Sequence, residues 1–155
     1  MKSCTIRPAT AADQRTITAI IRRAGINPMA LHWQRFLLAE ADGEIIGTVQ
    51  VKPHGDSTRE LASLAVIPEW QGQGIGTALM QAALALETGP LYLTCRSEIE
   101  GYYTRFGFRP LARDELTPYF RRLARIADGF SVLARLFGRP VRMSVMVRPV
   151  RSPKT

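Results

Sequence analysis

The sequence predicts an α/β domain whose first half is a strand meander and whose middle is a strand–helix–strand unit. Two observations predict it: short runs of β-type residues bounded by turn residues, and longer segments with apolar residues at helical spacing. The chain has 155 residues, 46% of them hydrophobic and 22% charged, which suits one globular domain with its own core. We expect a single domain over residues 1–149 and a C-terminal tail over 150–155.

The first half is predicted to hold one helix among four strands. Isoleucines at helical spacing give the helix an apolar face. The pair Asp42-Gly43 indicates a hairpin, and His54-Gly55-Asp56 marks the next reversal of the chain. The expected elements are a strand at 3–8, a helix at 11–24, and strands at 36–39, 44–51 and 60–67. The last of these is apolar enough for a central, buried strand.

The second half is predicted to alternate helices and strands. Ile75 and Leu79 belong to the apolar face of its first helix, and Gly107 is a natural C-terminal cap for its second. The expected elements are helices at 74–86 and 98–106, and strands at 91–95, from 108, and at 141–147.

Residues 114–139 carry an unbroken apolar stripe at spacings typical of a helix. Gly129 indicates two shorter helices rather than one. The stripe has three interpretations: a helix that covers its own sheet, a homodimer contact, or a membrane-surface contact. Its members are Tyr119, Leu123, Ile126, Phe130, Leu133 and Phe137.

The net charge of +8 comes entirely from residues 96–155, because acidic and basic residues cancel over 1–95. This asymmetry indicates an acidic partner or a solvated arginine-rich surface. The basic residues are interleaved with apolar ones, so we expect no nucleic-acid partner. No apolar run is long enough to span a membrane, and the start of the chain does not resemble a secretory signal.

Two cysteines, Cys4 and Cys95, make neither a disulfide framework nor a metal cluster, so we expect reduced thiols in a cytoplasmic protein. Cys95 is interpreted as a buried thiol at a strand end, with an acyl-cysteine intermediate as the alternative. Neither His32 nor His54 has a metal-binding companion nearby in the sequence, and no metal is expected.

The most informative segment is a buried strand, a proline, and a glycine-rich turn that opens a helix. Gly72, Gly74 and Gly76 leave backbone N–H groups uncovered at a positive helix terminus, which is suited to holding phosphate. A P-loop would need a lysine before Thr77, and none is there. The glycine spacing also differs from that of a dinucleotide fold.

Gln71, Gly74 and Gly76, preceded by Leu-Ala-Val-x-Pro, resemble the signature of the GNAT superfamily of N-acetyltransferases. The segment 101–108, Gly-Tyr-Tyr-Thr-Arg-Phe-Gly-Phe, resembles a second conserved stretch of that superfamily. The likeness covers residues 3–110 in the order of elements. It implies a mixed, mostly antiparallel central sheet of about six or seven strands flanked by helices, with 114–139 as an extra helical insertion.

The resemblance implies acetyl-CoA as co-substrate. Backbone groups along the strand and the glycine turn would then bind its pantetheine arm and pyrophosphate. The residues concerned are Leu64, Ala65, Val66, Gln71, Gly72, Gln73, Gly74, Ile75, Gly76 and Thr77. The strand is expected to separate from its parallel neighbour after Val66, which would leave such groups unpaired.

Tyr103 stands where the superfamily carries the tyrosine that protonates the departing thiolate, and a core aromatic is the alternative. Glu60 is the candidate general base, with a surface charge at a strand end as the alternative. Arg96 stands where many members carry an asparagine, so Ser97 and Glu98 are candidate replacements.

The expected reaction is direct attack of an amine, of a small molecule or a protein, on the thioester. A non-catalytic acyl-CoA-binding module, a different acyl donor, and a basic protein that binds membranes or nucleic acid are the alternatives.

Overall fold

The computed structural model describes residues 3–134, 138 and 141–150, which form two compact units. The first unit takes in residues up to 52 together with 61–87. The second consists of residues 53–60 and those from 88 onward. Among the described residues, no helix has both the length and the apolar character needed to cross a bilayer.

The strands form a seven-stranded mixed sheet in the described part of the chain, which confirms the predicted fold class. Four neighbouring pairs are antiparallel, β1–β2, β2–β3, β5–β7 and β6–β7, whereas β4 and β5 are parallel. The order is β1 (Thr5–Pro8), β2 (Phe36–Ala41), β3 (Glu44–Pro53), β4 (Arg59–Val66), β5 (Leu91–Arg96), β7 (Met143–Arg148) and β6 (Arg109–Pro110).

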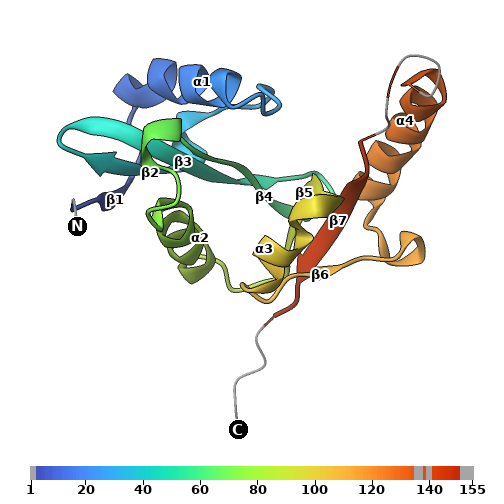
Figure 1. The fold of residues 1–155 in the computed structure, drawn as a ribbon. Helices are drawn as coiled ribbons and strands as arrows, with labels where there is room; N and C mark the ends of the chain where they lie inside the picture. Colours follow the sequence, from blue (N-terminus) through green and yellow to red (C-terminus); the bar gives the residue numbers. More distant parts are fainter. Residues whose placement is uncertain (1–2, 135–137, 139–140, 151–155) are drawn as a thin grey trace, which may run out of the picture. The chain divides into compact units, whose positions relative to one another are not determined.

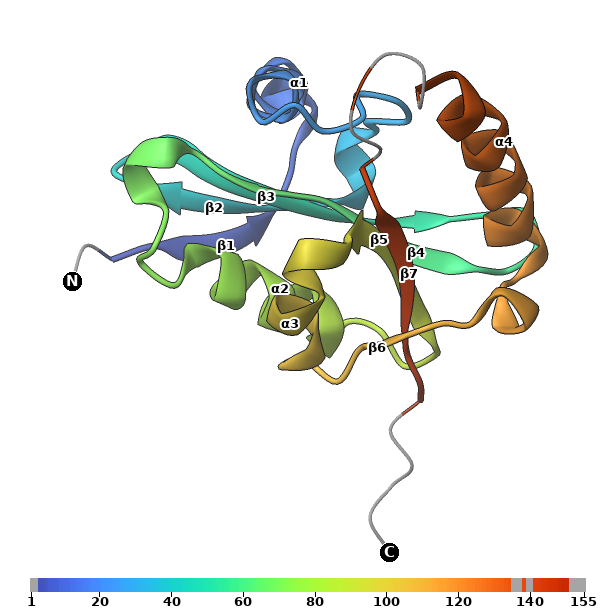
Figure 2. The same ribbon diagram turned by 45° about the vertical axis from the view of Figure 1, so that its right-hand side comes forward.

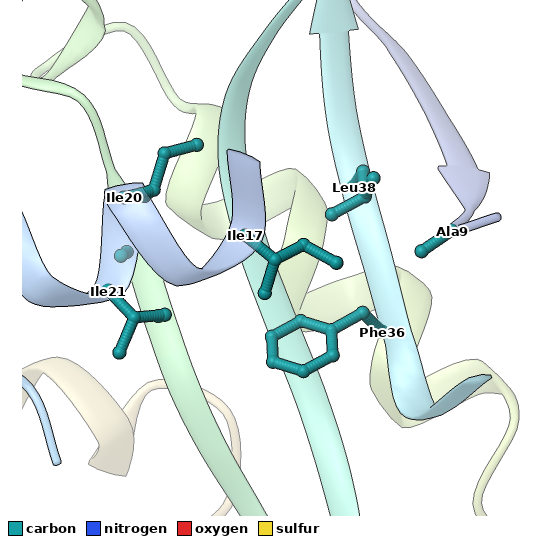
Figure 3. Close-up of a cluster of buried hydrophobic side chains, with 7 residues drawn as sticks. Ala9, Ile17, Ile20, Ile21, Phe36 and Leu38 are labelled. Atoms are coloured by element: carbon teal, nitrogen blue, oxygen red, sulfur yellow. The ribbon is translucent and has the colours of Figure 1, made fainter. Parts of the chain in front are cut away.

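In the first unit, α1 (Gln14–Arg23) and α2 (Ile75–Ala85) lie on opposite faces of β1–β3 (Figures 1 and 2). Ile17 and Ile21 of α1 are fully buried and point toward Phe36 of β2 (Figure 3). Each such side chain contributes about 1.5–3 kcal/mol through the apolar area it removes from water. The predicted apolar face of this helix is therefore confirmed.

A salt-bridge network fixes the start of α1 against β1 and β2. Arg7 donates to Asp13 at 2.9 Å and to Glu40 at 2.5 Å. Asp13 also accepts from the backbone N–H of Thr10 at 2.7 Å, which satisfies one of the amides that a helix start leaves unpaired. Arg7 holds the pKa of Asp13 well below its usual range.

The second unit is built around β7, which lies between β5 and β6. All six residues of β5 pair with β7, from Leu91 opposite Arg148 to Arg96 opposite Met143. A 3₁₀ turn at Ser97–Ile99 leads into α3 (Glu100–Thr104), and a longer helix, α4, spans Pro118–Ala134. In place of the expected helix over 98–106, the structure therefore has a 3₁₀ turn followed by a shorter α-helix.

The structure differs from the prediction for α4, which continues through Gly129 as one helix. Its first turn is anchored by Phe120, which is fully buried, but Leu123 is 38% and Ile126 58% exposed. The interpretation as a helix that covers its own sheet, which would bury both residues, is therefore wrong at these two positions, because periodicity gives a helix one apolar face without saying what covers it. The side chains of Phe130 and Leu133, and the whole of Phe137, lie outside the described residues. The dimer and membrane-surface interpretations stay predictions.

Candidate active site

The glycine turn has the backbone conformation that its sequence predicts. Gly72 has φ +73° and Gly74 φ +82°, a left-handed region that favours glycine. Gln71 donates to the Val66 carbonyl at 2.9 Å and Gln73 to the Glu69 carbonyl at 3.2 Å, so both side chains hold the turn from outside. The first backbone hydrogen bond of α2 is donated by the Ala78 N–H to the Gly74 carbonyl.

The backbone N–H groups of this turn are the part of it that could bind a ligand. No described residue accepts a hydrogen bond from the backbone N–H groups of Gly72, Gln73, Gly74, Ile75, Gly76 or Thr77. The last three are the first turn of α2, where the helix dipole adds positive potential. The turn can therefore offer several N–H donors to one anion.

Directly before the turn, β4 contains a kink at Ser63, whose φ is +56°. Two buried side chains of β3 hold it there: Thr48 donates its hydroxyl to the Ser63 carbonyl at 2.9 Å, and Gln50 donates to the Ser63 hydroxyl at 2.8 Å. The parallel ladder with β5 contains one register pair, Glu60 with Tyr92. The prediction of a separation after Val66 is therefore wrong in its position, because the ladder ends six residues earlier.

Tyr103 lies on α3 in the second unit, in an aromatic group with Tyr102 and Phe108. Burial raises the pKa of Tyr103 to about 12, with smaller contributions from Cys95 and Tyr102. The phenol is therefore fully protonated at neutral pH. Burial also raises the pKa of the Cys95 thiol to about 11. Cys95 is free and buried, as the sequence indicates.

Around the end of β5, the side chains form contacts that the sequence does not reveal. Arg96 is exposed and pairs with Glu98 at 3.4 Å. Ser97 shares a hydrogen bond of 2.9 Å with Ser144 of β7, and Ser144 donates in turn to Glu100. Of the two candidate replacements for the asparagine, only Ser97 belongs to this half-buried polar group.

Glu60, near the start of β4, is buried rather than at the surface, with 9% of its side chain exposed. Its Oε2 lies 2.7 Å from Nε2 of His54, whose side chain is 14% exposed. The His54 ring stacks on the Tyr119 ring, with 3.5 Å between centroids and 15° between planes. Sequence reasoning missed this pair. The signal was the short turn between them, because the two arms of a hairpin bring such residues together.

The predicted site residues belong to both units. Glu60 and Tyr103 lie in the second, and the ten predicted cofactor-binding residues, from Leu64 to Thr77, lie in the first. Within the described ranges, no group of three or more His, Cys, Asp or Glu side chains is arranged to hold a metal ion.

A family model for the acetyltransferase (GNAT) domain matches residues 32–110, about half of the chain and the region that contains the glycine turn. The chain belongs to the GNAT acetyltransferase family. The resemblance identified from the sequence is thereby confirmed.

The sequence is similar to mycothiol acetyltransferases. That of Streptomyces griseus is 40% identical over 81 residues, which make up 47% of this chain and 26% of that protein. That of Nocardia farcinica is 52% identical over 52 residues, or 33% of this chain and 17% of that protein. The match therefore spans about a quarter or less of these relatives.

Two solved structures show the same fold at low identity. An N-acetylglutamate synthase from Neisseria gonorrhoeae, complexed with coenzyme A and L-arginine, is 22% identical with a TM-score of 0.70; the match covers 98% of this chain and 34% of that one. The ribosomal-protein-S18-alanine N-acetyltransferase from Escherichia coli is 18% identical with a TM-score of 0.66, over 98% and 97%.

Proposed function

We propose that this protein transfers the acetyl group of acetyl-CoA to an amine of a small molecule or a protein, by direct attack of the amine on the thioester. The observation that carries the proposal is the row of N–H groups from Gly72 to Thr77 at the start of α2, for which the described part of the chain offers no acceptor. A pyrophosphate has the charge and the acceptor oxygens that this row requires. Family membership and the coenzyme A bound to a structural neighbour support the same donor.

The strand before the turn suits the rest of the donor molecule. Leu64, Ala65 and Val66 follow the Ser63 kink and lie beyond the single pair that joins β4 to β5. Backbone groups there would hydrogen-bond the amide-rich pantetheine arm.

Two residues are proposed for the proton transfers. The nucleophilic amine must lose a proton, directly or through water, and Glu60 is the residue proposed to make this possible. The sulfur must gain one, and Tyr103 is the proposed donor: its phenol is protonated at neutral pH, although burial makes it a weaker acid than a free tyrosine. With both substrates bound together, no covalent enzyme intermediate is required, in keeping with the raised pKa of Cys95.

A cytoplasmic location is proposed for the protein. Both cysteines are free thiols, which supports a reducing compartment. The identity of the acceptor amine is the object of the screen described next.

The test of donor binding is a melting-temperature shift. At 100 times its dissociation constant, acetyl-CoA should stabilise the protein by about 2.7 kcal/mol. Gly74→Val should abolish the shift, because its side chain would stand among the N–H donors. Gly43→Val is the matched control: Gly43 has a similar φ of +77° and, like Gly74, no atom near its missing side chain. The Gly43→Val variant should lose about as much stability as Gly74→Val but keep the melting-temperature shift with acetyl-CoA.

The test of catalysis is a screen of amines, amino acids, peptides and proteins with acetyl-CoA, measuring free thiol and acetylated product by mass. Amine-dependent thiol release is the expected result. A melting shift without thiol release for any amine would indicate an acyl-CoA-binding module, and no shift at all would refute the proposed donor.

A further inference from the structure

The hydrogen bond between His54 and Glu60 has the geometry of a proton-transfer pair. The two atoms, Nε2 and Oε2, are 2.7 Å apart, within the range of a charge-assisted bond. Both side chains are largely withdrawn from water. Ion pairs at the surface are usually loose, so a short, shielded pair that includes the candidate base calls for a role.

The chemistry of the pair determines which ring nitrogen is basic. A carboxylate can only accept, so with Glu60 ionised the hydrogen must be on Nε2 of His54. The neutral ring then carries its lone pair on Nδ1. No hydrogen bond to Nδ1 is formed by any residue within the described ranges. His54 therefore has one nitrogen held by Glu60 and the other ready to accept a proton.

The ring is also fixed in orientation. Tyr119 stacks on one face, and Phe120 contacts the ring edge-on with centroids 6.5 Å apart. Asp56, in the same turn as His54, accepts a hydrogen bond from the Tyr119 backbone N–H at 2.8 Å. The backbone N–H of His54 donates to the Thr58 carbonyl, also at 2.8 Å. A base that is held in this way loses little entropy when it meets its substrate.

Among the described residues, two titratable groups contact the His54 ring, Glu60 from β4 and Tyr119 from α4. Asp56 lies in the same turn and acts on Tyr119. Burial raises the pKa of Tyr119, with Glu60 and Asp56 adding to the effect, so its ring is neutral at physiological pH. A carboxylate bonded to one ring nitrogen stabilises the imidazolium that forms when the other nitrogen takes a proton.

We propose that His54 takes the proton of the acceptor amine at Nδ1, while Glu60 holds the Nε2–H and stabilises the imidazolium. The inference rests on the proposed function. An incoming ammonium loses one proton to Nδ1, which passes it to solvent. The nitrogen then bonds to the acetyl carbon as the carbon–sulfur bond breaks, and the proton that it still has to lose goes to the same ring, which again releases it to solvent. Tyr103 protonates the sulfur and recovers its proton from solvent.

The decisive variant is His54→Gln. A glutamine amide can still donate an N–H to Glu60, but it has no basic nitrogen. If His54 only positioned Glu60, kcat/KM for the amine would change little. If His54 is the base, kcat/KM should fall by about 10²–10⁴-fold, while the melting shift with acetyl-CoA is kept. The double variant His54→Gln with Glu60→Gln should be no slower than His54→Gln alone, because the two residues act as one unit.

Nitrogen-15 NMR gives a readout that is independent of activity. The chain has two histidines, so His32→Gln assigns the His54 signals, and because His32 is exposed this variant should keep full activity. In the neutral form of the ring, the hydrogen is expected on Nε2. A neutral ring with its hydrogen on Nδ1, or an active wild type matched by His54→Gln, would overturn the inference. A wild type that releases no thiol with any amine overturns the proposed function itself, and with it this inference.

Discussion

Tyr103 and Cys95 are both protonated at neutral pH, and burial raises the pKa of each further because it disfavours the charged form. The same physical cause has different consequences for the two residues. A neutral phenol is still able to donate a proton to a departing thiolate. A neutral, buried thiol is a poor nucleophile, so Cys95 is not suited to carry an acyl group.

Replacing Tyr103 by Phe removes one hydroxyl and keeps the ring that packs against Tyr102 and Phe108. If the phenol protonates the sulfur, kcat should fall by about 10²–10⁴-fold while acetyl-CoA affinity stays nearly constant. Single-turnover kinetics together with titration calorimetry would measure the two quantities. Wild-type kcat, where chemistry limits turnover, would remove Tyr103 from the mechanism.

How much of this site could be predicted depends on how local each feature is. The glycine turn depends on neighbours in sequence and on residues able to take positive φ, so Gly72 and Gly74 indicated it directly. The turn after His54 indicated that the chain reverses there, but the His54–Glu60 bond also depends on the register of the hairpin, which a single sequence does not specify. The exposure of Ile126 depends on what lies against α4, and residue periodicity carries no information on that.

At the scale of elements, α4 begins with a capping contact from far away in the chain. Asp56 accepts the backbone N–H of Tyr119, 63 residues later, and that of Thr58 in its own turn. The Thr58 side chain first, and then these backbone N–H groups, lower the pKa of Asp56 to about 2. One carboxylate thus fixes both the turn that carries His54 and the start of α4.

Asp56→Ala should therefore speed amide hydrogen exchange in the first turn of α4 several-fold, because the Tyr119 N–H loses its acceptor. The pKa of Asp56 is lowered in the folded protein, so its contribution is full above about pH 4 and is lost as the pH falls through 2. In the wild type, the protection of these α4 amides from exchange, measured relative to the amides of β5, should decline over that pH range. The Asp56→Ala variant should show no such decline.

The exposed acid Asp114 offers a control, and Asp114→Ala should leave exchange in α4 unchanged. Equal exchange in Asp56→Ala and the wild type would show that the contact does not stabilise the helix.

At the scale of the whole molecule, the second unit is discontinuous in sequence. Residues 53–60 belong to it, although 61–87 belong to the first unit. This short segment supplies Asp56 to α4, the ring of His54 to Tyr119, and Glu60 as the partner of Tyr92 in β5. Residues 88–155 alone would lack all three contacts.

A fragment of residues 88–155 should consequently fail to fold by itself. Its circular dichroism should lack a cooperative thermal transition, and mixing it with a fragment of residues 1–87 should restore one. The full-length protein, treated in the same way, provides the reference signal. A cooperative transition in the isolated 88–155 fragment would contradict the importance of the 53–60 segment.

The position of β7 between β5 and β6 also sets an order of events during protein synthesis. β6 ends at Pro110, and its partner in the sheet is complete only when Arg148 has been added. At about 5–20 residues per second, the ribosome needs roughly 2–8 s to make that intervening stretch. Through this interval the nascent chain exposes β5 along the side that β7 will cover. β7, which is translated after both of its neighbours, therefore covers the exposed side of β5, and a ribosome that stalls before it would leave that edge open to a molecular chaperone or to aggregation.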